Sequence, residues 1–68
     1  MIYAVDNTII IKSGKNMEYR IYNVAGQLVK QGKSTGETTS VFGMEAGVYL
    51  VKSVTDTSDF IKKIIINH

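Results

Sequence analysis

The chain has 68 residues, which is enough for one domain with a small core. It contains no cysteine, so neither a disulfide nor a cysteine-ligated zinc can stabilise it, and the 44% of hydrophobic residues must form the core alone. Eight Lys and Arg against six Asp and Glu give a formal net charge of +2. Nucleic-acid binding needs a concentrated basic face, whereas the longest basic run here is the pair Lys62-Lys63, so no nucleic-acid partner is expected. No apolar run approaches the ~20 residues of a membrane-spanning helix, so no membrane insertion is expected either.

Short β-rich runs separated by turn residues begin at the N-terminus. Residues 2–5 form the first run, which ends at the turn formers Asp6 and Asn7. Residues 8–12 are a nearly continuous branched run, which predicts a strand that is covered on both faces. Residues 13–16 read Ser-Gly-Lys-Asn and predict a turn, because Gly and Asn tolerate positive φ.

Residues 17–33 predict a β-hairpin. Side chains alternate along its first strand, which places Met17, Tyr19 and Ile21 on one face and Glu18, Arg20 and Tyr22 on the other. Residues 23–26 form the corner, with Gly26 as the left-handed residue, and residues 27–33 form the returning strand.

The second half continues the alternation of short strands and turns. We expect a polar loop over residues 34–37, a strand over 38–42, a glycine-bounded corner over 43–47, a strand over 48–54, a polar turn over 55–59 and a final strand over 60–66. Tyr49 and Val51 are expected to face the core and Lys52 the solvent. Because there is no proline, five lysines are the candidates to protect exposed strand edges: Lys12, Lys30, Lys52, Lys62 and Lys63.

These elements predict an all-β fold. About seven short strands at regular spacing favour an antiparallel, immunoglobulin-like β-sandwich, and no connection is long enough for a crossover helix between parallel strands. A small five-stranded barrel is the alternative architecture.

The sequence offers little for catalysis. The one histidine is the terminal His68, and no glycine-rich phosphate-binding pattern is present, so we expect no enzyme activity and no cofactor. Asp56 and Asp59 could bracket a calcium site, but Asp and Ser are also what a hairpin turn selects, and the turn is the favoured interpretation. Tyr22 is expected to be the most exposed aromatic ring, and a single ring does not make a sugar-binding platform.

Three segments in order carry a family resemblance: residues 19–29 (YRIYNVAGQLV), residues 47–52 (GVYLVK) and residues 60–66 (FIKKIII). They resemble the C-terminal sorting domain of type IX secretion cargo (the Por secretion tail) and closely related C-terminal β-modules of Bacteroidetes. The resemblance spans roughly residues 8–67. The residues that match the family's motifs, and are therefore sorting-motif candidates, are Gly26, Gly47, Tyr49, Lys62 and Lys63. The proline-containing element with which the family usually begins has no counterpart in this chain.

The resemblance implies a non-catalytic C-terminal module that is recognised by outer-membrane translocon and sorting proteins. The parent protein is then expected to be secreted or displayed on the cell surface, with residues 1–68 as one β-sandwich module next to an upstream domain. Two alternatives remain open: an accessory adhesion or carbohydrate-binding module, and a structural spacer that stabilises a neighbouring domain.

Overall fold

The computed structural model describes residues 1–12, 16–35, 38–56 and 58–67. These residues form seven β-strands: β1 (Ile2–Val5), β2 (Thr8–Lys12), β3 (Asn16–Asn23), β4 (Leu28–Thr35), β5 (Thr38–Val41), β6 (Gly47–Val54) and β7 (Asp59–Ile66). In the described part of the chain there is no helix with the length and apolar character needed to cross a membrane.

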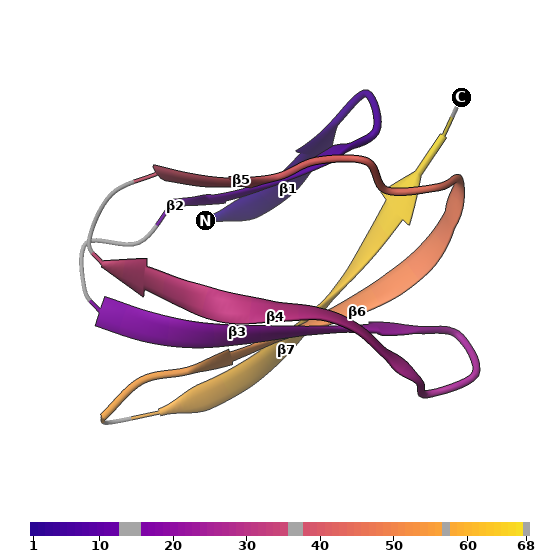
Figure 1. Ribbon diagram of the computed structural model, residues 1–68. Helices are drawn as coiled ribbons and strands as arrows, with labels where there is room; N and C mark the ends of the chain where they lie inside the picture. Colours follow the sequence, from indigo (N-terminus) through magenta and orange to yellow (C-terminus); the bar gives the residue numbers. More distant parts are fainter. Residues whose placement is uncertain (13–15, 36–37, 57, 68) are drawn as a thin grey trace.

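The strands form two layers (Figure 1). A three-stranded sheet has the order β1-β2-β5, a four-stranded sheet has the order β4-β3-β6-β7, and every pairing is antiparallel. β7 runs diagonally from the lower layer toward the upper one, where it contacts β1. The prediction of an all-β antiparallel sandwich is therefore confirmed, and the five-stranded barrel is wrong because the strands pair into two separate sheets.

The strand bounds agree with the predicted ranges to within two residues. The largest difference concerns Ser34 and Thr35, which were expected in a loop but continue β4 opposite Met17 and Asn16. Ser34 is buried on the inner face opposite Met17, and its Oγ accepts a hydrogen bond (3.0 Å) from the Thr39 hydroxyl on the facing sheet. Of the predicted turn over residues 13–16, Asn16 instead begins β3, and residues 13–15 lie outside the described residues, as do residues 36–37 of the predicted loop.

The core lies between the layers and is mainly aliphatic. Its members are Ile2, Ile9, Ile11, Met17, Ile21, Val41, Met44, Tyr49, Val51, Ile64 and Ile66. In β2, Ile9 and Ile11 are fully buried, while Ile10 points to the opposite face and is only half-buried. The prediction that this strand is covered on both faces is wrong, because the three-stranded sheet packs against the other sheet on one face only.

The β3–β4 hairpin contains two adjustments that fit it to the core. The partners of Ile21 and Tyr22 are Lys30 and Leu28, so Val29 is the extra residue of a β-bulge. Farther along, Gly32 leaves room for Tyr19, because a Cβ there would lie 2.6 Å from the tyrosine hydroxyl oxygen. Tyr19 can therefore pack against the core across its neighbouring strand.

Three of the lysines expected at sheet edges, Lys30, Lys62 and Lys63, do lie on edge strands, and the first two lie on the inner face. Lys30 of β4 pairs with Ile21, and Lys62 of β7 pairs with Val51, so both lysines share a face with buried residues. Inward-pointing charges on edge strands oppose pairing with another chain. Lys12 and Lys52 instead lie on the internal strands β2 and β6, so the prediction that they protect edges is wrong.

Candidate functional site

The corner of the β3–β4 hairpin is organised by Asn23. Its Oδ1 accepts hydrogen bonds from the backbone N–H groups of Ala25 and Gln27, each at 3.0 Å, and its Nδ2 donates to Gln27 Oε1 at 2.9 Å. The Asn23 carbonyl also accepts the Gly26 N–H at 3.0 Å. Gly26 has φ +83°, so the left-handed conformation predicted for it is confirmed.

Asn23→Ala is expected to lower the free energy of unfolding by about 1–2 kcal/mol, because two backbone N–H groups lose their side-chain acceptor. Asn23→Asp is the matched control, since it keeps an oxygen in the accepting position and loses only the donor to Gln27. Urea unfolding followed by circular dichroism measures both. Equal losses in the two variants would show that the Oδ1 contacts do not stabilise the corner.

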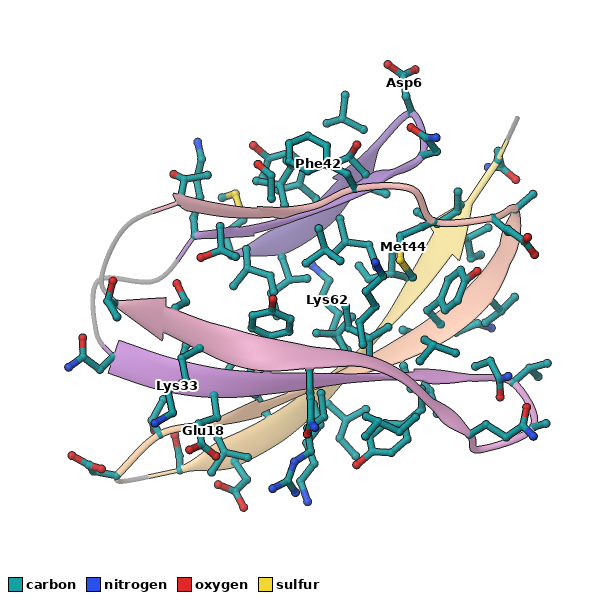
Figure 2. The ribbon with its side chains drawn as sticks, in the orientation of Figure 1. Asp6, Glu18, Lys33, Phe42, Met44 and Lys62 are labelled. Carbon is teal, nitrogen blue, oxygen red and sulfur yellow. The ribbon has the colours of Figure 1, made fainter. Side chains whose placement is uncertain are left out.

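The corner over residues 43–47, which leads into the second candidate segment, is part of the connection from the three-stranded sheet to the four-stranded one. Gly43 has φ +73° and Gly47 has φ +153°, which explains the glycine at each end of the corner. Between them, Met44 inserts into the core, and its N–H donates to the Asn7 carbonyl at 3.0 Å (Figure 2). The Tyr49 hydroxyl donates to the Glu45 carbonyl at 2.8 Å, so the tyrosine fixes the corner from which its own strand departs.

The two lysines of the third segment lie on opposite faces of β7. Lys62 extends into the space between the layers, on the same face as its partner Val51. Lys63 pairs with Leu50 and lies on the other face, away from the three-stranded sheet. Both side chains are exposed. The pair is therefore not one basic site but two cations separated by the sheet.

The register brings the three segments together at one end of the four-stranded sheet. Asn23 is opposite Tyr49, and Tyr49 is opposite Ile64, so one row of the sheet crosses all three segments. The next row crosses them again, through Tyr22, Leu50 and Lys63. Gly26 lies in the hairpin corner beyond these rows, and Gly47 begins β6 opposite Ile66. Asn23 was expected in the corner and lies in the first segment, but it was not among the candidate site residues, because its hydrogen bonds to Ala25 and Gln27 cannot be read from the sequence.

The remaining candidates from the sequence are the turn that contains Asp56 and Asp59, the terminal His68, and Tyr22. The turn after β6 is held by Thr55, whose hydroxyl donates to the Ser58 carbonyl at 2.9 Å and accepts the Ser58 N–H at 3.1 Å, as the turn interpretation predicts. Within the described ranges, no three His, Cys, Asp or Glu side chains are grouped so that they could hold a metal ion. Thr57 of that turn and His68 lie outside these ranges. Tyr22, expected to be exposed, is half-buried beside Leu28 and Leu50.

Comparison with protein families matches residues 5–67 to the family described as "Secretion system C-terminal sorting domain". The match covers all three candidate segments and all seven strands except the first residues of β1. Searches of curated proteins and of solved structures found no match.

Proposed function

Because this chain belongs to the family of C-terminal sorting domains of the type IX secretion system, we propose that it is a non-catalytic sorting and surface-attachment module that an outer-membrane secretion machinery recognises. The observation that carries this proposal is the family match over residues 5–67, nearly the whole chain. In the proposed role the domain directs export of a larger parent protein to the cell surface or the medium.

The fold supports recognition of a folded surface by the secretion machinery, because folding brings separate sequence segments together. The segments that contain Gly26, Gly47 and Lys63 converge on one end of the four-stranded sheet, so a partner could contact all three at once. Tyr49 is buried and is proposed to contribute by holding the corner before β6 in place. Lys62 faces the other side of β7 and is proposed to contribute by keeping the edge strand unpaired. The partners proposed are the translocon and sorting proteins of the outer membrane, together with the upstream domain of the parent.

Fusing residues 1–68 to the C-terminus of a periplasmic reporter tests the proposal in a host with a type IX system. We expect reporter activity in the medium or on the cell surface, and loss of that activity in a mutant host that lacks the translocon. A parallel fusion carries a proline-containing segment upstream of Met1, so that a missing first element is not mistaken for a missing function. Retention of both fusions in the periplasm would contradict the proposal.

A further inference from the structure

The outer face of the four-stranded sheet is the face that points away from the three-stranded sheet. It carries the charged residues Glu18, Arg20, Lys33, Lys52, Asp59 and Lys63, all exposed except the half-buried Lys52. Figure 2 shows Glu18 and Lys33 of adjacent strands projecting from it, on the side opposite Met44 and Lys62. Strand alternation places every second residue of β3, β6 and β7 on this face. Register, and not sequence proximity, determines which of these side chains are neighbours.

Three cations gather at the middle of the outer face. Arg20 and Lys52 are direct cross-strand partners, and their other partners, Gln31 and Ile61, carry no charge. Lys63 pairs with Leu50, two residues along β6 from Lys52, and so lies diagonally next to it. Among the described residues, none of the three cations forms an ion pair or a hydrogen bond through its side chain. Like charges directly opposite each other destabilise a sheet, so the isolated domain retains a repulsion here that an anion would relieve.

Apolar side chains adjoin these cations. Leu28 is 46% exposed, Leu50 39%, Ile61 63% and Ile65 52%, and the pairings place them on the same face as Lys63. Tyr22 lies between Leu28 and Leu50 in the row of Lys63. An exposed apolar patch of this kind, joined to uncompensated charge, is typical of a protein interaction surface.

We propose that the outer face docks an acidic protein segment of the secretion machinery. A carboxylate of that segment lies over Arg20, Lys52 and Lys63, and its apolar side chains pack on Leu28, Leu50 and Ile65. Charge complementarity favours an acidic occupant, because the three cations have no ion-pair partner among the described residues. The exposed apolar residues beside them favour an occupant that also carries apolar side chains. This inference rests on the sorting function proposed above and specifies the surface and the partner through which it acts.

An acidic segment fits this face better than an anionic membrane surface. The row next to Arg20 and Lys52 contains Lys33, its partner Glu18 and, at the β7 end, Asp59, whose partner is Val54. A flat anionic surface would meet these two carboxylates together with the cations. A peptide segment can place its own carboxylates over the cations and leave the row of Glu18 and Asp59 uncovered.

Charge reversal tests the proposal in the export assay. Lys52→Glu and Lys63→Glu are each expected to lower export of the reporter by at least about tenfold, since a favourable contact becomes a repulsive one. Both variants should melt at the wild-type temperature or higher, because each removes a like-charge neighbour. Lys30→Glu is the matched control: it makes the same charge change on an exposed lysine of the inner face, and export should persist. If the wild-type fusion and both outer-face variants were exported equally well, the docking inference would be overturned and the sorting function would stand. If the wild-type fusion were not exported at all, the result would count against the sorting function itself.

Direct binding measurements distinguish an acidic peptide from an anionic membrane as the occupant of the outer face. The probes are a synthetic peptide of alternating Asp and Val, a Lys-Val peptide of the same length, and vesicles that contain phosphatidylglycerol. NMR titration of the labelled domain should show shifts at Arg20, Lys52 and Lys63 with the Asp-Val peptide, abolished by Lys63→Glu and absent with the Lys-Val peptide. Absence of those shifts, or sedimentation with the vesicles that Lys63→Glu abolishes, would overturn the proposal.

Discussion

An Ile21→Ala variant is expected to lose much of the domain's free energy of unfolding at 25 °C. Ile21 is fully buried at the middle of β3, between β4 and β6, and packs in the aliphatic core. Truncating a buried isoleucine costs about 2–5 kcal/mol, because the transfer free energy is lost and a cavity remains. A domain of this length has a total stability of roughly 3–10 kcal/mol, so the loss removes much of it.

Urea unfolding followed by circular dichroism measures the effect. Ile10→Ala makes the same chemical change on the outward face of β2, where the side chain is half-buried, and should cost clearly less. Ile21→Val should cost about 0.5–1.5 kcal/mol. If the Ile10 and Ile21 truncations were equally costly, the two-layer core would be incorrectly placed.

Tyr49→Ala is expected to destabilise the domain by about 3–5 kcal/mol, the range for removing a large aromatic side chain from a core. Tyr49 is buried, lies between Asn23 and Ile64 in its row, and holds the corner before β6 through its hydroxyl. Export of a fused reporter should fail as a result of unfolding. Loss of export in this variant would therefore not identify Tyr49 as a contact to the machinery.

Tyr49→Phe distinguishes a structural role of the Tyr49 hydroxyl from a direct contact of that hydroxyl with the secretion machinery. It removes only the hydrogen bond to the Glu45 carbonyl, which should cost about 1 kcal/mol and leave the ring in the core. Thermal melting and reporter export are measured on the same variant. A variant that melts near the wild-type temperature yet is not exported would show that the hydroxyl is read by the partner, contrary to the structural role assigned here.

Much of the fold could be predicted from local patterns. Alternation gave the inward face of β3, with Met17 and Ile21 buried and Tyr19 packed against the core, because a side-chain period of two depends only on neighbouring residues. The positive φ of Gly26 followed from its place in a turn-forming tetrapeptide. Local pattern failed for residues 8–12, since a run of isoleucines does not reveal whether a second layer covers one face or both.

The site was harder to predict because it depends on pairing between distant strands. Nothing in the sequence places Arg20 opposite Lys52 or Lys63 diagonally beside them, since that requires the β3–β6 and β6–β7 registers. The pair Lys62-Lys63 looks like a single basic element in the sequence, but the pleat of β7 sends the two side chains to opposite faces. The roles of Asn23 and of the Tyr49 hydroxyl also became apparent only when their hydrogen-bond partners were known.

The strand pairings also bear on how quickly this domain can fold. Hairpins join β1 to β2, β3 to β4 and β6 to β7, but β2 must find β5, and β3 must find β6, each across a long intervening stretch of chain. Domains dominated by such non-local pairings fold in about milliseconds to seconds, far more slowly than helical bundles of similar size. A newly synthesised chain of this topology therefore spends an interval with its strands unpaired before the two sheets form.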